Sequence, residues 1–450
     1  MDTTTPVSFD VHAMRRARVV EALRELGGGV AVLLTAPTRT RNRDSEYPYR
    51  YDSAFWWLTG FGEPESAIVI VVTPDRAYTT LFCQEKDVER ELWEGARLGV
   101  EAAAATLGVD LALPIDMLDE ELPKVLAYAP ALFIPFGSES ALEAQAQQWI
   151  ASVRSLHRHA TPPAVIRDLS PILDELRLVK DAHELSIMRA AGSISADAHR
   201  RAMRATRAGR FEYEIEAELL YEFRRRGAQA PAYTPIVAAG VAACTLHYVA
   251  NNAVLRDGDL LLVDAGCELD GYASDITRTW PINGRYTAAQ RALYELVLAA
   301  QTAAIACIAP GRRYDEAHRA AVRTLTQGLL DLGVLKGSLD DLIESKAYGR
   351  FYMHGTGHWL GLDVHDVGDY RVPGSGPGRD GERPSRPLVP GMTMTVEPGL
   401  YVRAADDVPE RFHDIGIRIE DDVVVTATGC ELLTRGVPVE PGEIERLVRD

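Results

Sequence analysis

A proline-bearing stretch at residues 161–171 divides the chain into two regions with different hydrophobic patterns. Before it, short apolar runs typical of strands, such as 30–34 and 67–73, alternate with segments of helical spacing up to about residue 165. Such alternation of strands and helices indicates an α/β domain. We expect the stretch itself to be a linker, because proline cannot continue a helix and is excluded from central strands.

After this stretch, longer helical patterns dominate. Apolar residues recur at helical spacing in three segments, at 174–207, 212–226 and 288–308. Gly192 lies inside the first segment and weakens the prediction of an unbroken helix there. Short strands and a loop rich in glycine and proline follow. We therefore expect an α/β domain at 1–173 and a second domain at 174–450.

The composition excludes several classes of protein. Lys and Arg number 48 and Asp and Glu 65, which gives a formal net charge of −17. A chain this acidic repels phosphates, so we expect neither nucleic acid nor a membrane surface as a partner. The five cysteines are scattered and form no CxxC pair, which excludes a disulfide framework and a thiolate zinc site. With no signal-like or membrane-spanning segment near the N-terminus, we expect a cytoplasmic protein.

Two aspartates, Asp264 and Asp275, flank a predicted hairpin. An apolar run precedes Asp264, and a second predicted strand follows Asp275. If Glu268 pairs with Gly271 across a two-residue turn at 269–270, the two aspartates stand directly opposite each other, with Cβ atoms roughly 4.5–5.5 Å apart. Ionised carboxylates at that separation repel each other unless a proton or a cation lies between them. The hairpin thus suits a pair of metal ions, and the alternative is a pair of surface aspartates near a turn.

Three of the eleven histidines, His354, His358 and His365, fall within twelve residues. Neutral imidazole is a common ligand of transition metals and a common acid or base. The glycines between these histidines permit tight bends that can direct several imidazoles to one cavity. Their spacing misses the dinucleotide-binding fingerprint by one residue, which excludes a nucleotide site.

A second pair of carboxylates comes near the C-terminus. Glu397 ends a predicted strand and is followed by Pro398. Further on, isoleucines alternate with polar residues over 415–420, which places Arg418 and Glu420 on the same face of a strand. An arginine beside a carboxylate could orient it as a metal ligand. The alternative for this segment is an ordinary half-solvated strand.

Together these segments resemble the Xaa-Pro aminopeptidase (aminopeptidase P) family. The matching stretches lie at 263–266, 274–279, 354–366, 395–401 and 416–421 and, in the N-terminal half, at 44–50, 55–61 and 92–99. The resemblance implies an α+β pita-bread (creatinase/aminopeptidase-like) catalytic domain at 174–450. It also implies an α/β domain of the creatinase/aminopeptidase P N-terminal type at 1–173.

The resemblance also assigns roles to particular residues. It implies two divalent metal ions held by five ligands, Asp264, Asp275, His358, Glu397 and Glu420. It places three accessory catalytic histidines around the substrate, His247, His354 and His365. Arg418 and Tyr401 lie in matching segments and are expected near the substrate or the ligands. Trp93 is expected to help close a neighbouring subunit's site, with a core aromatic as the alternative.

Four carboxylates and one imidazole form an oxygen-rich set, so we expect Mn²⁺. The expected reaction is release of the N-terminal residue from peptides with proline second, by a hydroxide that bridges the two metals, with Glu397 as general base. The family implies a homodimer or homotetramer. The alternatives are a prolidase-like dipeptidase with the same five ligands, a non-catalytic pita-bread binding module and a metal-free creatinase-like hydrolase. The last two typically lack the full set of ligands.

Overall fold

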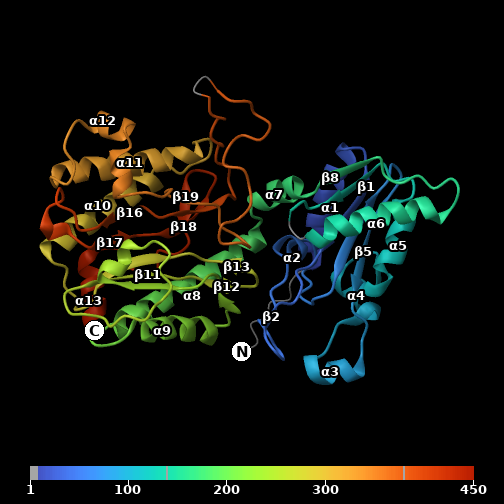
Figure 1. Ribbon diagram of the computed structural model, residues 1–450, viewed down its shortest axis with the longest axis horizontal. Helices are drawn as coiled ribbons and strands as arrows, with labels where there is room; N and C mark the ends of the chain where they lie inside the picture. The colour runs from blue at the N-terminus through green and yellow to red at the C-terminus, as the bar shows by residue number, and fades with distance from the viewer. Residues whose placement is uncertain (1–8, 138–139, 379–380) are drawn as a thin grey trace. The chain divides into compact units, whose positions relative to one another are not determined.

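The structure is a computed structural model that describes residues 9–137, 140–378 and 381–450. The chain forms two compact units, Met1–Leu176 and Arg177–Asp450. In Figure 1 the first unit is coloured from blue to green and the second from green to red. Within the described part of the chain, no helix is both long and apolar enough to cross a membrane.

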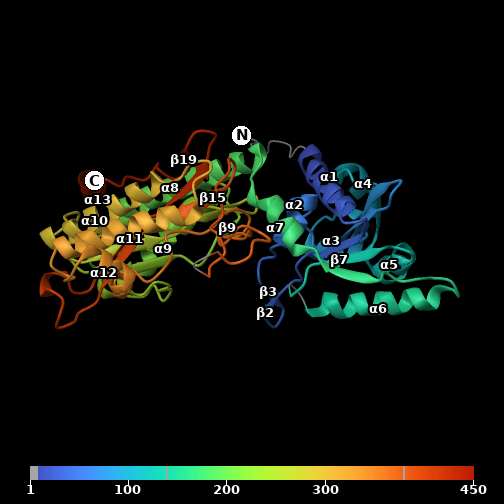
Figure 2. The same cartoon turned by 90° about the horizontal axis from the view of Figure 1, so that it is seen from above.

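The first unit is built on a six-stranded sheet with the order β6-β5-β4-β1-β7-β8. The central strand β1, Gly29–Leu34, runs antiparallel to β4, Ala67–Val72, and parallel to β7, Ala131–Ile134. Helices α5, Leu118–Leu126, and α6, Ser140–Leu156, pack their leucines and Trp149 on one face of this sheet. Helix α1, Phe9–Glu25, lies on the opposite side of the sheet in Figure 2.

The remaining elements of this unit are β2 Thr40–Asn42, β3 Ser45–Glu46, α2 Ser53–Thr59, β5 Ala77–Cys83, α3 Val88–Glu94, α4 Gly99–Leu107, β6 Leu111–Pro114, η1 Ile115–Met117, β8 Val165–Asp168 and α7 Ser170–Leu178.

The prediction of a linker at 161–171 is wrong. Strand β8 pairs in parallel with β7 and forms an edge of the sheet, and α7 begins two residues after it. Two of the prolines, Pro162 and Pro163, precede the strand, while Pro171 lies in the first turn of α7. A first-turn proline costs the helix nothing, because its missing N–H has no partner within the helix. The prolines therefore mark element boundaries rather than a linker.

The second unit packs several small sheets against long helices. One sheet has the order β10-β11-β14, a second β13-β12-β9 and a third β15-β18-β19, and β16 pairs with β17 alone. Helix α8 packs along α9, and α10 packs along α11. Figure 1 shows strands lying between the α8–α9 pair and the α10–α11 pair.

The elements of this unit are α8 Ala182–Ala205, α9 Glu212–Arg225, β9 Ala230–Pro231, β10 Ile236–Ala239, η2 Gly240–Cys244, β11 Leu260–Asp264, β12 Cys267–Leu269, β13 Tyr272–Ala273, β14 Thr277–Pro281, α10 Ala288–Ile305, α11 Tyr314–Asp331, α12 Leu339–Glu344, η3 Ala347–Arg350, β15 Thr393–Val396, β16 Gly399–Val402, η4 Glu410–Phe412, β17 Ile415–Arg418, β18 Asp421–Val425, β19 Cys430–Leu432 and α13 Pro441–Arg449.

The helical pattern predicted over 174–207 is two helices. Helix α7 ends at Leu178, and Asp181 caps the new helix α8 by accepting from the backbone N–H of Glu184. The Glu184 side chain accepts in return from the backbone of Asp181, which completes a capping box. Gly192 does not break α8. A Cβ at this position would lie 2.7 Å from the carbonyl oxygen of Leu433, so glycine permits a close approach of two backbones.

The predicted register of the aspartate hairpin is also wrong, by two residues. Leu269 pairs with Tyr272, so the turn consists of Asp270 and Gly271, with φ of 48° and 82°. An Asp-Gly pair with both φ values positive is the turn that matches the twist of a hairpin. Asp264 consequently lies opposite Thr277 instead of Asp275. A shift of two residues leaves each side chain on its original face of the sheet, because side chains alternate with a period of two.

Candidate metal centre

The two hairpin aspartates meet at one tyrosine. Asp264 ends β11, and Asp275 lies between β13 and β14; both are buried. The hydroxyl of Tyr233 is 2.6 Å from Oδ1 of Asp264 and 2.5 Å from Oδ1 of Asp275. The carboxylates therefore converge on one shared hydroxyl group although they are not directly opposite in the sheet. Asp422 fixes the second aspartate further by accepting from the backbone N–H of Asp275 at 3.0 and 3.2 Å.

The C-terminal carboxylates reach the same place from another sheet. Val396 pairs with Asp421, so Glu397 and Glu420, the next residues on each side, emerge at the same end of the β15–β18 pair. Asp275, His358 and Glu420 offer ligand atoms that all lie within 4.8 Å of one another. Nε2 of His358 is 3.6 Å from Oδ2 of Asp275 and 3.7 Å from Oε1 of Glu397. The structure thus brings the five predicted ligands together.

Hydrogen bonds fix both the ring and the backbone of His358. Its Nδ1 lies 3.0 Å from the carbonyl oxygen of Trp359, which fixes a proton on Nδ1 and directs Nε2 toward the carboxylates. The backbone is held by Thr395: its N–H donates to the carbonyl of His358, and its hydroxyl accepts from the N–H of His358. This is the geometry of an imidazole prepared to bind a cation.

Arg418 contacts a different carboxylate from the one expected. Its Nη2 donates to Oδ2 of Asp264 at 2.5 Å, while its Nε donates to the hydroxyl of Thr277 at 3.1 Å. That hydroxyl in turn donates to Glu420 at 2.6 Å, so Arg418 reaches Glu420 only through Thr277. The alternative of a half-solvated strand is wrong, because Arg418, Glu420 and the alternating isoleucines are all buried.

Tyr401 links Arg418 to His354. Nη1 of Arg418 donates to the Tyr401 oxygen at 2.9 Å, and that hydroxyl lies 2.9 Å from Nε2 of His354. Nδ1 of His354 is 2.7 Å from the carbonyl oxygen of Gly355, which places its proton on Nδ1. The same nitrogen lies 3.8 Å from Oε2 of Glu397. The chain of contacts therefore joins one accessory histidine to the carboxylate cluster.

The other accessory histidines are held less firmly. The His365 ring lies 4.0 Å from the His358 ring, centroid to centroid, and the residue is exposed. His247 lies in an exposed turn after η2, near enough to His354 and His365 to help lower the pKa of both.

Trp93 belongs to α3 of the first unit and is 86% exposed. The alternative of a core aromatic is wrong for Trp93.

The buried carboxylates of the centre carry more negative charge than the nearby cations neutralise, and burial together with this charge shifts the pKa values of several groups. Burial raises the pKa of Glu397 to about 7 and raises the pKa of Glu420 well above its ordinary value. Burial alone would lower the pKa of His358, but Asp275 and Glu397 raise it to about 9. Burial, with help from Arg418, lowers the pKa of His354 to about 4. Buried carboxylates that compete for protons in this way are a donor set that divalent cations would neutralise.

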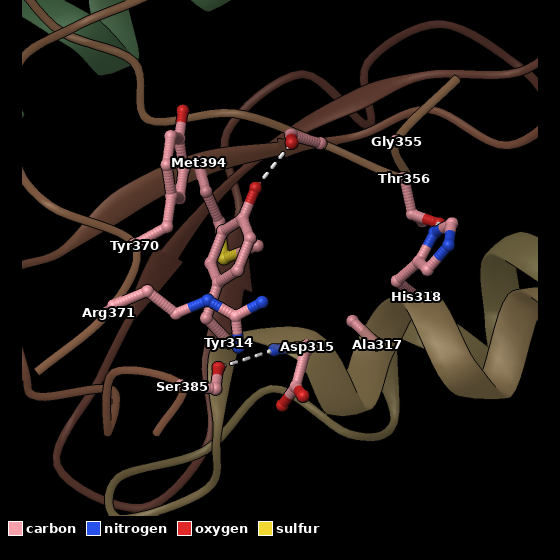
Figure 3. A pocket seen from close by; sticks show the side chains of 11 residues that line it. Tyr314, Asp315, Ala317, His318, Gly355, Thr356, Tyr370, Arg371, Ser385 and Met394 are labelled. Atoms are coloured by element: carbon pink, nitrogen blue, oxygen red, sulfur yellow. Dashed lines mark hydrogen bonds between the residues drawn. The ribbon is translucent and has the colours of Figure 1, made fainter. Parts of the chain in front are cut away.

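A cavity of about 230 Å³ borders the segment between His354 and His358. Helix α11 forms one wall, where the Tyr314 hydroxyl donates to the carbonyl of Gly357 and Nδ1 of His318 lies 2.8 Å from the hydroxyl of Thr356 (Figure 3). The predicted ligands are absent from the described lining of this cavity. Thr356 also accepts from the backbone N–H of Glu397 at 2.8 Å, so α11 supports the metal centre through this segment.

Three residues of the centre were missed by the sequence analysis. Thr277 lies in the stretch 274–279, and the correct hairpin register would have placed it beside Asp264. Asp422 follows directly on Glu420 and Asp421, where an acidic run gave no sign of which carboxylate faces the hairpin. Tyr233 carries no local signal at all, because its partners lie 31 and 42 residues further along the chain.

Two family profiles match the chain. Residues 186–427 match metallopeptidase family M24, and residues 12–133 match the aminopeptidase P N-terminal domain. The first match covers more than half of the chain and includes the whole of the candidate metal centre. The predicted fold class, an α/β domain followed by a pita-bread catalytic domain, is confirmed.

Similar proteins agree over nearly the full length. The Xaa-Pro aminopeptidase of Escherichia coli K12 is 44% identical over 436 residues, which are 96% of each chain. The solved structure of the Pseudomonas aeruginosa aminopeptidase PepP superposes with a TM-score of 0.93 at 48% identity and covers 98% of each chain. Aminopeptidase P from E. coli with the inhibitor Pro-Leu superposes with a TM-score of 0.92 at 42% identity and 98% coverage of each chain.

The chain therefore belongs to metallopeptidase family M24 and, within it, to the Xaa-Pro aminopeptidases. Membership of a metallopeptidase family implies divalent metal ions, and the buried carboxylates and imidazole of this centre are the donors that such ions require.

Proposed function

We propose that this protein is a two-metal exopeptidase that releases the N-terminal residue from peptides with proline in the second position. The observation that carries the proposal is the convergence of Asp264, Asp275, His358, Glu397 and Glu420, from two sheets and a loop, on one buried spot. The E. coli relative that carries the name Xaa-Pro aminopeptidase matches along almost the whole chain and supports the choice of substrate class.

The five residues are proposed as the ligands of two divalent ions, with Mn²⁺ as the metal. Four carboxylates supply charge and oxygen donors, which suit a hard cation, and one neutral imidazole completes the set. When bound, the ions supply Lewis acidity that polarises the scissile carbonyl and lowers the pKa of a water molecule. Tyr233, Thr277 and Arg418 hold these carboxylates in place through hydrogen bonds.

Glu397 is the proposed general base. Its carboxylate lies at the centre of the cluster, between the rings of His354 and His358. A carboxylate in this position can accept the proton of the attacking water and pass it to the departing proline nitrogen. That nitrogen carries no hydrogen in the peptide, so it must gain a proton before proline can leave.

The three accessory histidines are proposed to bind the peptide around the scissile bond. Burial lowers the pKa of His354, and burial followed by the nearby His358 lowers the pKa of His365. The lowered pKa values favour the neutral form of both rings, so these rings add less positive charge beside the metal ions. His247, from the exposed turn after η2, is the third group in this set.

We also propose that the protein is a cytoplasmic homodimer or homotetramer. Helix α3 exposes three large apolar side chains, Val88, Leu92 and Trp93, at 78%, 80% and 86%. Such an exposed apolar group is typical of a protein interface, and Trp93 is its proposed contact with a neighbouring subunit. All five cysteines are free, as expected in a reducing compartment. Light scattering of Trp93→Ala and Leu92→Glu variants tests the assembly, and an unchanged oligomer would contradict this interface.

A peptide panel tests the function and separates it from its nearest rival. The proposal predicts cleavage of tripeptides with proline second and release of the first residue, and no cleavage where alanine replaces that proline. A prolidase-like enzyme would instead require the Xaa-Pro dipeptide. Cleavage restricted to dipeptides would exclude an aminopeptidase.

A further inference from the structure

A buried cluster of charges lies next to the histidine segment. Asp366 accepts at Oδ2 from Nζ of Lys180 and at Oδ1 from Nη2 of Arg177, both at 2.7 Å. Arg177 also contacts Asp363 at 2.7 Å. The side chains of Lys180 and Asp366 are each only 1% exposed. One carboxylate is therefore held by two cations, Arg177 in the last turn of α7 and Lys180 in the connection to α8.

The cluster closes a loop between two of the site histidines. The backbone N–H of Asp366 donates to the carbonyl of Trp359 at 2.9 Å, which joins the two ends of this loop. Gly361 lies against the charges: a Cβ at this position would be 2.1 Å from Oδ2 of Asp366 and 2.8 Å from Cε of Lys180. The absence of a side chain at residue 361 thus permits the contact between Lys180 and Asp366.

The two histidines at the ends of this loop differ in what holds them. His358 has two backbone contacts with Thr395 that do not involve the cluster, and its Nδ1 lies against the carbonyl of Trp359, which also accepts from Asp366. Among the described residues no hydrogen bond holds the His365 ring, which stacks on His358 and directly precedes Asp366 in the chain. The position of His365 therefore depends on where Asp366 is anchored.

A structural role alone accounts poorly for these charges. Burying an ion pair costs desolvation that its attraction often fails to recover, and apolar residues of similar volume are commonly as stabilising. What an ion pair adds is a defined geometry, because two cations at fixed positions permit one placement of the carboxylate. The residue that gains a defined position here is the neighbour of Asp366.

We propose that Lys180 and Arg177 are positioning residues that act through Asp366 to hold His365 against the His358 ring, where His365 contacts the substrate. This inference rests on the proposed function, since it requires His365 to take part in peptide cleavage.

The test is a double-mutant cycle between Lys180→Met and His365→Ala, assayed on a tripeptide with proline second. We expect Lys180→Met to lower kcat/KM by roughly 10- to 100-fold, the order expected for a catalytic group displaced by about 1 Å. Metal content should stay at the wild-type value, because His358 keeps its own contacts. In the His365→Ala background the same substitution should cause little further loss.

The control is Arg16→Met in the first unit. Arg16 is also buried and donates to the carbonyls of Leu58 and Leu107, far along the chain from the histidine segment. This variant should lower the melting temperature without the kinetic coupling to His365. Lys180→Gln, which keeps a donor for Asp366 but removes the charge, replaces Lys180→Met if that variant does not fold. Its loss of kcat/KM should be smaller, and it should likewise disappear in the His365→Ala background.

An unchanged kcat/KM in the folded Lys180 variant, or equal losses from Lys180→Met with and without the His365 ring, would overturn the inference. Failure of the proposed function would look different, because the wild-type protein itself would then leave the Xaa-Pro tripeptide intact.

Discussion

The carboxylate ligands of the metal centre and its three accessory histidines are held in different ways. We call these two groups the carboxylate side and the imidazole side. Asp264 and Glu420 lie at strand ends, are buried, and each receives a hydrogen bond from a hydroxyl on a neighbouring segment. His354 and His365 lie on a loop, and His247 lies in an exposed turn. The loop histidines are positioned by few contacts, such as the Tyr401 hydroxyl for His354.

This difference matches the two tasks of the site. Metal ions require ligands at fixed separations, and strands supply that rigidity. A peptide has to enter and leave, so the groups that bind it belong on loops that can adjust. Changes on the carboxylate side should therefore affect metal binding, while changes on the imidazole side should affect turnover with the metals in place.

The largest effect is expected at Glu397, which belongs to both sides. Glu397→Ala should lower kcat by at least about 1000-fold, because it removes a proposed ligand and the proposed general base. Steady-state kinetics and metal analysis on the folded variant measure this. The matched control is Glu431→Gln, a surface carboxylate paired with Arg189, which should keep full activity. Near-normal turnover of Glu397→Ala would refute the assignment.

A buried histidine behind the hairpin should make the carboxylate side sensitive to acid. His199 lies 2.9 Å from the carbonyl oxygen of Ala265, and burial lowers its pKa to about 4. The unfolded chain takes up a proton near pH 6.5, whereas the folded protein does so only near pH 4. The unfolding free energy should therefore fall between these values as the pH drops, by about 3 kcal/mol in total.

Urea unfolding of the wild type and His199→Gln between pH 7 and pH 4 isolates this contribution. The variant should lack this part of the pH dependence, so its unfolding free energy should fall less steeply. Identical slopes for the two proteins would contradict this account, because they would show that the pKa of His199 is the same in the folded and unfolded chains.

The shared hydroxyl of Tyr233 should control metal affinity. Tyr233→Phe removes the contact with Asp264 and Asp275, and loss of a hydrogen bond to a ligand typically costs 10- to 100-fold in affinity. Titration of metal-free protein with Mn²⁺ measures the change. Tyr221→Phe, at a half-exposed tyrosine on α9, is the control and should bind metal like the wild type. Equal affinity in the Tyr233 variant would mean that the two aspartates need no help to converge.

The smallest effect is expected from Tyr401→Phe on the imidazole side. This change frees Nε2 of His354 and one N–H of Arg418, and it should lower kcat about tenfold without loss of metal. The ratio of kcat to metal content distinguishes this outcome from the preceding one. If Tyr401→Phe loses metal in parallel with activity, the claim that the imidazole side affects turnover but not metal binding is contradicted.

Residues that lie in short, distinctive sequence segments could be predicted from the sequence. The five candidate ligands fall in short segments of unusual composition, and the structure brings them together. The resemblance on which their roles rest is confirmed by the family matches. The roles themselves, and the domain boundary at 173–174, stay predictions.

Contacts between segments far apart in the chain could not be predicted in the same way. Tyr233 has no pattern of its own, and Arg418 contacts Asp264 across 154 positions. The predicted hairpin register is wrong because it puts the turn at 269–270, one residue too early. The Asp-Gly pair at 270–271 carries the stronger turn signal. Strand β8 could not be predicted, because the prolines that flank this short strand are equally typical of a linker.

The most direct test of the account is the activity of metal-free protein titrated with Mn²⁺ on a tripeptide with proline second. The account predicts that chelation abolishes cleavage and that Mn²⁺ restores it with two ions bound per chain, a stoichiometry that Asp275→Ala should lower. Full cleavage by protein shown to contain no divalent ion would contradict it.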